Sequence, residues 1–206
     1  MRYTGPKNRI ARQLGVDLGL KTPGTKSHAR LLKRLNIPPG QHGIKGRRKI
    51  SERALQLREK QKLRFMFGIS ESQLKKYFKK ASKKKGNTAL FLCQFLERRL
   101  DNVVYRLGFA PTRASARQLV AHKHIKVNGK VLNIPSYLVK VNDIISFADE
   151  KITEVPEIKQ SLQNKDLILP SWLNKEGKIG KVIGEPSMDL IEKQVHLRLV
   201  IEYYSR

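Results

Sequence analysis

The chain has 206 residues, of which 43 are Lys or Arg and 17 are Asp or Glu, so its formal net charge is +26. This length allows one large or two small domains with a real core, and the charge indicates a polyanionic partner, nucleic acid before an anionic membrane surface. No apolar run approaches the roughly 18 residues of a membrane-spanning helix. The N-terminus does not resemble a signal peptide, and the single cysteine excludes a disulfide framework or a cysteine-based zinc site.

The positive charge is concentrated in the first 85 residues. They hold 25 Lys or Arg and 4 Asp or Glu, whereas residues 86–147 hold 9 and 3, and residues 148–206 hold 9 and 10. We therefore expect residues 1–147 to make nearly all contacts with a nucleic acid. The nearly neutral tail is expected to complete the body of the protein or to meet another protein.

Residues 1–50 are predicted to be a basic extension with only two short helices, near 9–14 and 27–35, because Gly and Pro interrupt the rest. Gly40, Gly43 and Gly46 recur every third residue but lack the Ser or Thr that a phosphate-binding P-loop requires. A segment this basic is expected to become ordered mainly against its partner. Packing on the body of the protein is the alternative.

Two helices are predicted between residues 51 and 86, each with a serine N-cap. Ser51 opens the first, which ends at Gly68, and Ser70 opens the second, with Gln73 completing a capping box. Apolar residues at helical spacing are expected to form the buried faces, namely Ala54, Leu55, Leu63 and Met66 in the first helix and Leu74, Tyr77, Phe78 and Ala81 in the second.

Lysines cover the other faces of the second helix, with seven among the eleven residues 75–85. No acidic residue in this stretch pairs with them at i,i+4, so they repel one another unless an anion binds. Phosphate contact is therefore favoured over a merely solvated face.

A third apolar stripe predicts an uninterrupted helix from Thr88 to Gly108, and Cys93 beside it is expected to be a buried, unreactive thiol. Thr112 is then predicted to cap a helix on which Arg113 and Arg117 share one face.

The periodicity changes to alternation after this helix, and Asn128-Gly129 predicts a hairpin between strands at 124–127 and 130–134. Further strands are expected at 137–141 and 144–147. In the tail, residues 148–165 are expected to be helical and Trp172 to anchor residues 170–173. Strands are expected at 178–183 and 196–202, with a turn of helix at 189–193.

The chain resembles a known family in these same segments. The runs Glu97-Arg98-Arg99-Leu100-Asp101-Asn102, Thr112-Arg113, Val127-Asn128-Gly129 and Asn133-Ile134-Pro135-Ser136-Tyr137 are similar to the small RNA-binding module named after ribosomal protein S4. Pro39-Gly40-Gln41-His42-Gly43, Lys85-Gly86-Asn87-Thr88 and Glu202-Tyr203-Tyr204-Ser205-Arg206 extend the similarity over the whole chain. The chain is thus identified by resemblance as a member of the small-subunit ribosomal protein S4 family, of bacterial or organellar type.

The resemblance implies a structural protein of the ribosome, cytoplasmic or organellar, that has no enzymatic role and no cofactor. It implies binding to the 5′ domain of 16S-type rRNA at a five-way junction, early assembly of the subunit body, and a contribution to translational accuracy. The implied partners are small-subunit rRNA, the neighbouring proteins S5 and S12, and mRNA near its entry channel. Two partners stay open for the segment around residues 45–49, namely the same rRNA and that mRNA; no membrane is expected.

One departure from the family concerns metal binding. Many members carry a zinc knuckle of four cysteines near the N-terminus, but residues 7–35 contain none. His28 and His42 cannot supply the four ligands of structural zinc, so no metal is expected. RNA contact and loop packing both stay open for His42.

Two other functions use a similar module. Arg99-Leu100-Asp101 resembles part of the active-site motif of pseudouridine synthases, but Arg98 stands where that motif has Gly, and the remaining chain is short and helical. Asp101 is therefore expected to cap a helix or to pair with an arginine. Stand-alone RNA chaperones with this module are the second alternative, and they lack a long N-terminal extension.

We predict an α+β protein with a basic extension (1–50), a helical domain (51–96, completed by 185–206), an RNA-binding module of two helices and antiparallel strands (97–160), and a C-terminal segment (161–206) packing on both. The predicted RNA-binding residues are Lys7, Arg9, Arg12, His42, Lys45, Arg47, Arg48, Lys49, Arg53, Lys79, Lys80, Lys83, Lys84, Lys85, Arg98, Arg113, Arg117, His122, Lys123, His124, Lys126 and Lys130.

Overall fold

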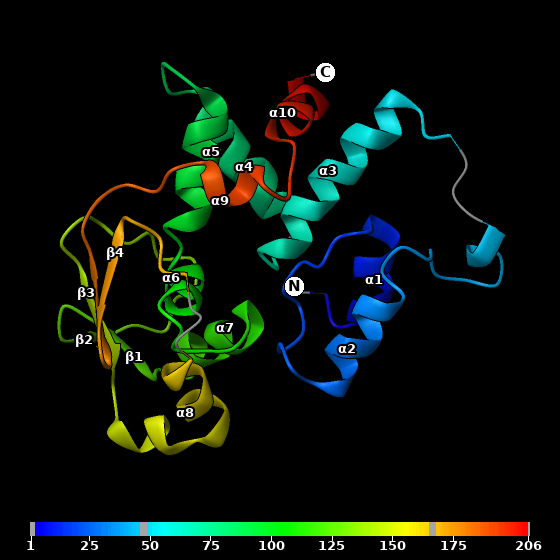
Figure 1. Ribbon diagram of the computed structural model, residues 1–206. Helices are drawn as coiled ribbons and strands as arrows, with labels where there is room; N and C mark the ends of the chain where they lie inside the picture. Colours follow the sequence, from blue (N-terminus) through cyan, green and yellow to red (C-terminus); the bar gives the residue numbers. More distant parts are fainter. Residues whose placement is uncertain (1–2, 46–48, 165–167, 206) are drawn as a thin grey trace. The chain divides into compact units, whose positions relative to one another are not determined.

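The computed structural model describes residues 3–45, 49–164 and 168–205 (Figure 1). The chain forms two compact units. We call residues 1–92 with 188–206 the helical unit and residues 93–187 the mixed unit. Helices dominate the first unit and an antiparallel sheet belongs to the second, so the predicted α+β class is confirmed.

The N-terminal segment contains two short helices, α1 (Lys7–Leu14) and α2 (Lys26–Lys33), close to their predicted positions. Thr25 caps α2, since its side chain accepts a hydrogen bond from the backbone N–H of His28 at 3.3 Å. A single 3₁₀ turn, η1 (Gly43–Lys45), follows. The segment has more core than its composition predicted, because it buries Ile10, Ala11, Leu14, Leu18 and Leu31.

Helix α3 (Glu52–Met66) begins at the predicted cap, where Ser51 Oγ accepts a hydrogen bond from the Ala54 N–H at 3.4 Å. Its buried face is only partly the predicted one. Leu63 and Met66 are buried, but Ala54 and Leu55 are exposed, and the polar residues Gln56, Glu59 and Lys60 are buried in their place.

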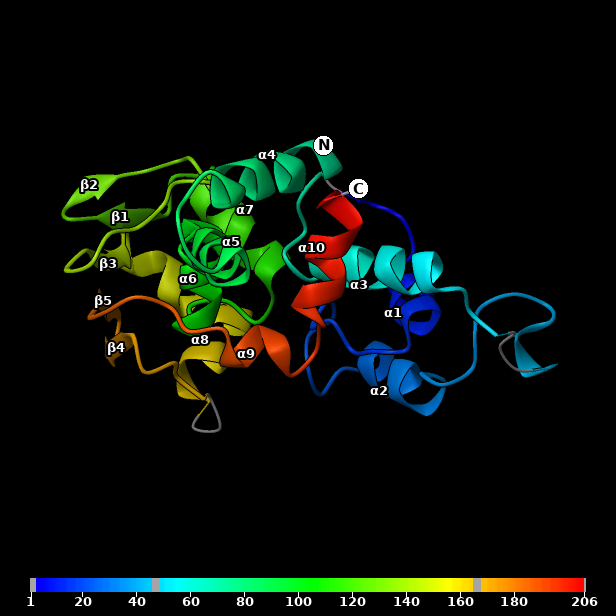
Figure 2. The same ribbon diagram turned by 90° about the horizontal axis from the view of Figure 1, so that it is seen from above.

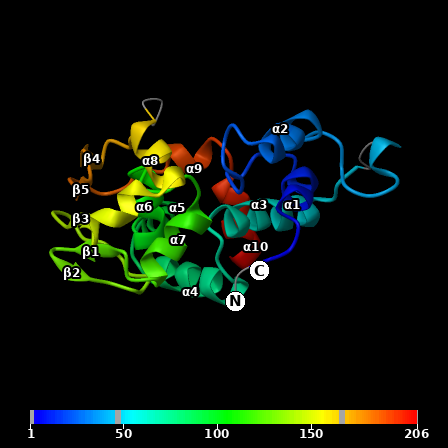
Figure 3. The ribbon, with the colours of Figure 1, turned by 90° about the horizontal axis from the view of Figure 1, so that it is seen from below.

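Helix α10 (Leu197–Ser205) explains the polar face of α3, beside which it lies (Figures 2 and 3). The Gln56 amide donates to Glu202 at 3.2 Å, and the backbone N–H of His196 donates to Glu59 at 3.0 Å. The predicted strand at 196–202 is wrong, because Leu197 and Val200 are buried three residues apart, as on one helix face. The predicted turn of helix at 189–193 is confirmed by α9 (Asp189–Glu192).

Helix α4 (Glu71–Ser82) opens with the predicted capping box. Ser70 Oγ accepts from the Gln73 N–H at 3.3 Å, and the Gln73 side chain accepts from the Ser70 N–H at 3.4 Å. The predicted apolar face of α4 is buried, and α5 (Thr88–Glu97) follows.

The predicted continuous helix from Thr88 to Gly108 is wrong: it is interrupted between α5 and α6 (Leu100–Arg106). Arg99 is extended, with φ −66° and ψ 135°, and pairs with Leu138 in an isolated bridge. The Leu100 N–H donates to the Tyr137 carbonyl at 2.8 Å, and the Val139 N–H donates to the Arg98 carbonyl at 2.9 Å. Residues 137–139 therefore pair with the extended backbone at residues 98–100, between the two helices. They do not form the strand predicted at 137–141.

Helix α7 (Arg113–Ala121) and the strands complete the mixed unit. Thr112 caps α7 as predicted, and residues 128 and 129 adopt positive φ angles of 51° and 78° in the predicted hairpin turn. The sheet has the order β2-β1-β3-β5-β4, all neighbours antiparallel, with β1 (Ile125–Val127), β2 (Lys130–Val131), β3 (Ile144–Phe147), β4 (Leu173–Glu176) and β5 (Ile179–Val182).

The core of the mixed unit lies between the inner face of this sheet and helices α6 and α7. Trp172 is buried in it, as expected of an anchor, and Ile125, Ile145 and Val182 contribute from the strands. The stretch predicted as helical after residue 148 forms η2 (Glu150–Glu154) and α8 (Pro156–Gln163).

Candidate nucleic-acid interface

Helix α4 carries a concentration of exposed lysines in the helical unit. Because Leu74, Tyr77, Phe78 and Ala81 are buried, the lysines on the other faces of α4 and in the turn after it point to solvent. Lys84 lies over the Phe91 ring at 5.0 Å. Within the described part of the chain, no ion pair joins a carboxylate to Lys79, Lys80, Lys83 or Lys85.

Among the predicted RNA-binding cations of residues 1–53, some are bonded within the fold and others are exposed to solvent. The guanidinium of Arg12 donates to the Ile37 and Pro38 carbonyls at 2.9 and 3.0 Å, so it fastens the loop after α2. Lys7 is half-buried, and Arg47 and Arg48 lie outside the described residues. The exposed members of the set are Arg9, His42, Lys45, Lys49 and Arg53.

Arg113 and Arg117 lie on one face of α7 as predicted, but the fold treats them differently. The Arg113 guanidinium is 4.5 Å from the Tyr105 ring centroid, and its Nε donates to Asn102 Oδ1 at 2.8 Å. Burial, followed by the charge of Arg106, lowers the pKa of Arg113 below its ordinary value. Arg117 is 3.9 Å from Asp101 and is more exposed.

A buried polar network below α7 holds Arg113 in place. Glu97 accepts from Arg106 Nη2 at 2.6 Å and from Asn102 Nδ2 at 2.7 Å. Burial opposes the charge on Arg106, but the neighbouring Glu97 carboxylate outweighs it and raises the Arg106 pKa. No pattern in the sequence selects Glu97 or Asn102, because a five-residue spacing across a helix break matches no helical periodicity.

The pairing expected for Asp101 is confirmed. Its carboxylate accepts from Arg99 Nε and Nη2 at 3.0 and 2.6 Å, and the Arg99 side chain is 0% exposed. This two-point contact is a structural ion pair inside the unit. Arg98 also serves the fold, since its Nε donates to the Val139 carbonyl at 2.8 Å, and the prediction that Cys93 is buried is likewise confirmed.

The hairpin end of the mixed unit carries the remaining predicted cations. His122 and Lys123 are exposed after the last turn of α7, where residue 123 has a φ of 66°, and the rings of His122 and His124 are 6.1 Å apart. Lys126 is half-buried on β1, and Lys130 is exposed on β2. These side chains, with Arg117, form a cationic surface on a rigid support, which suits an RNA backbone.

The described residues contain no group of three or more His, Cys, Asp or Glu that could hold a metal ion. None of the described helices is long and apolar enough to cross a membrane.

Exposed cations on two folded units, one of them a helix pair joined to a small sheet, indicate the class of nucleic-acid-binding proteins. The model of the ribosomal protein S4/S9 N-terminal domain matches residues 2–97, and the S4 domain matches residues 98–145. The chain belongs to the ribosomal protein S4 family, whose members are proteins of the small ribosomal subunit.

Curated relatives agree with this family over their full length. The small ribosomal subunit protein uS4 of Aquifex aeolicus is 50% identical over 213 residues, covering 100% of this chain and 99% of the relative. Protein uS4A of Symbiobacterium thermophilum is 47% identical over 207 residues, which cover 100% of this chain and 99% of the relative. Protein uS4 of Bacteroides fragilis is 44% identical over 207 residues, again covering 100% and 99%.

Proposed function

We propose that this chain binds the 5′ domain of 16S-type rRNA directly and holds a multi-helix junction in one geometry, so that the body of the small subunit assembles around it. The exposed lysines of α4, for which the described residues supply no carboxylate in an ion pair, carry this proposal. Their mutual repulsion is relieved when they bind RNA phosphates, and in doing so they release the counterions condensed on the RNA. The role is structural, in the ribosome of the cytoplasm or of an organelle, and includes no catalysis or cofactor.

The predicted interface divides into residues free to contact RNA and residues already used by the fold. The proposed direct contacts are the α4 lysines, the exposed cations of residues 9–53 and the hairpin set. Arg12, Arg98 and Arg113 contribute mainly by fixing backbone or neighbouring side chains. Shape-selective RNA binding requires both kinds of residue, because phosphates are recognised by charges at fixed spacings.

A charge-matched pair of variants tests this division. Lys79, Lys80, Lys83 and Lys85 are replaced together by Gln, and the control replaces the exposed Lys140, Lys151, Lys159 and Lys193, giving the same change in net charge. Binding to a 5′-domain transcript is measured over a series of salt concentrations. Each lost phosphate contact lowers the salt slope by about 0.7–0.9 in the α4 variant, with a smaller change in the control. Equal losses in both variants would mean that net charge alone drives binding.

The neighbouring partners follow from the same placement in the subunit. We propose contacts with S5, and a contribution to accuracy together with S12, made by parts of the chain that the RNA leaves uncovered. Intact subunits containing the chain at one copy each would support this role. A chain found only free or on precursor RNA would favour the alternatives, an RNA chaperone or an RNA-modifying enzyme.

We also propose that the segment around Lys45 and Lys49 contacts mRNA at its entry site. Both lysines are exposed, and residues 41–50 contain no Phe, Tyr or Trp, so the contact is to phosphates and independent of base sequence. Neutralising Lys45, Arg47 and Arg48 together is expected to leave subunit assembly intact and to slow translation through structured messages. Failed assembly, with unchanged translation by the surviving subunits, would assign these cations to rRNA.

A further inference from the structure

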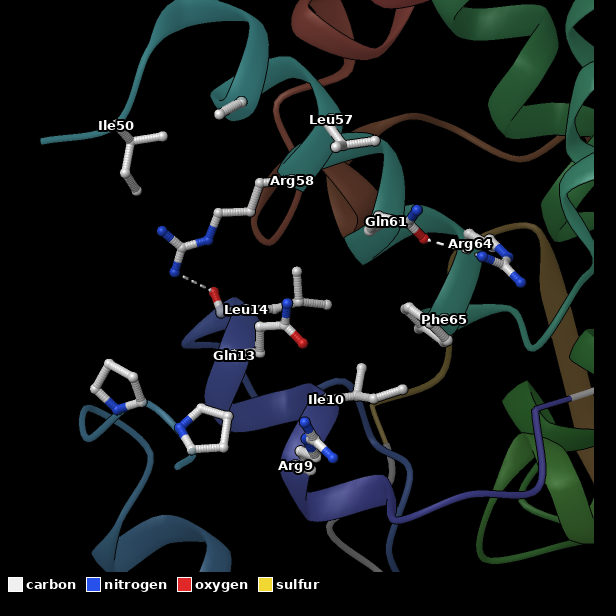
Figure 4. Close-up of a pocket in the computed structure, with 13 residues that line it drawn as sticks. Arg9, Ile10, Gln13, Leu14, Ile50, Leu57, Arg58, Gln61, Arg64 and Phe65 are labelled. Atoms are coloured by element: carbon white, nitrogen blue, oxygen red, sulfur yellow. Dashed lines mark hydrogen bonds between the residues drawn. The ribbon is translucent and has the colours of Figure 1, made fainter. Parts of the chain in front are cut away.

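The helical unit contains a hollow that, apart from Arg9, is lined by none of the proposed direct RNA contacts. It has a volume of about 770 Å³ and lies between α1, the Pro38-Pro39 turn and α3 (Figure 4). This volume is in the range of small-molecule sites. Its walls are largely apolar, with Ile10 and Leu14 on one side and Leu57 and Phe65 on the other.

The charged groups around the hollow all have one sign. Arg9, Arg58 and Arg64 line it, and its lining includes no Asp or Glu among the described residues. Arg58 is held in place by donating from Nη2 to the Leu14 carbonyl at 2.8 Å. Arg64 Nε is buried and has no hydrogen-bond acceptor within the described part of the chain. A buried donor without an acceptor is costly, so it favours an occupant that brings one.

An aromatic ring, a planar guanidinium and two side-chain amides at the hollow indicate which kind of anion fits it. The Arg64 guanidinium lies 5.1 Å from the Phe65 ring centroid, which puts a planar cation and an aromatic ring together on α3. Gln13 and Gln61 add amide groups, and Gln61 Oε1 accepts from Arg64 Nη1 at 3.2 Å (Figure 4). Unpaired bases are bound in this way, by stacking on aromatic rings and guanidinium planes and by hydrogen bonds to their edges.

We propose that the hollow takes one unpaired nucleotide extruded from the rRNA, with its base between the apolar walls and its phosphate on the arginines. The inference rests on the proposed rRNA-binding function and adds a base contact to the contacts with the RNA backbone proposed above. An apolar segment of a neighbouring protein would bring no negative charge to the three arginines, so the charge favours the nucleotide.

Helix α3 offers a matched pair of variants. Leu57 and Leu55 are 40% and 39% exposed on the same helix, but only Leu57 is among the residues lining the hollow. Leu57→Trp fills the space without changing charge, and Leu55→Trp is the control. Binding to the 5′-domain transcript is measured together with base-specific chemical probing of the RNA, after a thermal melt has compared the two folds.

We expect Leu57→Trp to weaken binding roughly 5- to 100-fold, the range of one lost stacked base, with an unchanged salt slope. The wild type and Leu55→Trp should protect a discrete unpaired base from the base-specific probe, and Leu57→Trp should expose it. If the two variants bind and protect alike, the nucleotide site is absent even though rRNA binding itself is intact. If Leu57→Trp alters only the incorporation of a neighbouring protein, the hollow is a protein contact and the proposal fails.

A second pair of variants keeps the test decisive if the larger side chain disturbs the fold. Gln13→Glu places a carboxylate on the lining, and Gln194→Glu makes the same charge change at an exposed position of the helical unit away from it. Loss of base protection in Gln13→Glu alone supports the site, and equal behaviour overturns it. Failure of the wild-type chain to bind the transcript would instead remove the proposed function, and this inference with it.

Discussion

Helix α4 in the helical unit and the region around α6 and α7 in the mixed unit use their positive charges in opposite ways. On α4 the apolar face is buried and the lysines stand in solvent, whereas the mixed unit directs Arg98, Arg99, Arg106 and Arg113 onto carbonyls, carboxylates and a tyrosine ring. Lysine suits the first use, since it is a strongly hydrated point charge on a flexible stem, and arginine suits the second through its planar set of donors. Basic residues in a sequence are therefore available to a partner where the fold offers them no acceptors, and they stabilise the fold where it does.

The largest expected effect on stability comes from breaking the buried pair of the mixed unit. Asp101→Ala leaves the fully buried Arg99 without its carboxylate and should lower the free energy of unfolding by about 3–5 kcal/mol. Urea unfolding followed by the fluorescence of Trp172, the single tryptophan, reports on this unit. Arg198→Ala, which removes an ion pair whose arginine is 91% exposed, should change stability by less than about 1 kcal/mol. Similar losses in both variants would contradict the contrast drawn here.

The next largest effect separates the two arginines of α7. Arg113→Met loses the contact with Tyr105 and the hydrogen bond to Asn102, and should cost about 1.5–3 kcal/mol. Arg117→Met loses a 3.9 Å approach to Asp101 by a side chain that is 27% exposed and should cost less than about 1 kcal/mol, while weakening RNA binding. The same fluorescence-detected unfolding measures both. Equal stability of the two variants would show that Arg113 supports the fold no more than Arg117 does.

A smaller, pH-dependent effect is expected in the helical unit, which has one internal ionic cluster at α3, α4 and α10. Burial alone would raise the pKa of Glu71, but hydrogen bonds from Lys60 at 2.9 Å and Tyr204 at 2.8 Å outweigh it and lower that pKa below 4.5. The ionised carboxylate therefore favours the folded state. This stabilisation is complete above about pH 4.5 and is lost as the pH falls through the folded pKa.

Glu71→Gln tests that dependence. Because the Glu71 side chain is 42% exposed and screened by solvent, the loss at neutral pH should be below about 1 kcal/mol. Hydrogen exchange of α10 as a function of pH measures it, and the variant should lose part of the acid sensitivity of this helix. A wild-type profile that is flat between pH 5 and 3 would show that Glu71 does not contribute.

The smallest expected effect on stability belongs to the α4 lysines. Replacing Lys79, Lys80, Lys83 and Lys85 by Gln should change the free energy of unfolding by no more than about 0.5 kcal/mol, since these exposed side chains pair with no carboxylate in the described chain. Thermal melts at low and high salt check this. A large destabilisation would mean that the lysines support the fold, and their use for RNA would need another explanation.

What the sequence alone determined about this protein is mostly local. Ser51, Ser70 and Thr112 cap their helices and Asn128-Gly129 turns the hairpin, because each of these devices is complete within a few residues. The uneven distribution of charge and the runs that resemble the S4 family were also present in the sequence, and they led to the family that the comparisons confirm.

The tertiary structure alone decided which polar groups are buried. Glu59 and the His196 N–H meet across 137 positions, and Gln56 and Glu202 across 146, so no periodicity could show that α3 buries a polar face or that residues 197–205 form a helix. The interruption at Arg99 depends in the same way on carbonyls from residues 135–137. Whether an arginine is available to RNA was likewise fixed only by packing, because a buried donor must find an acceptor and the nearest one lies within the fold.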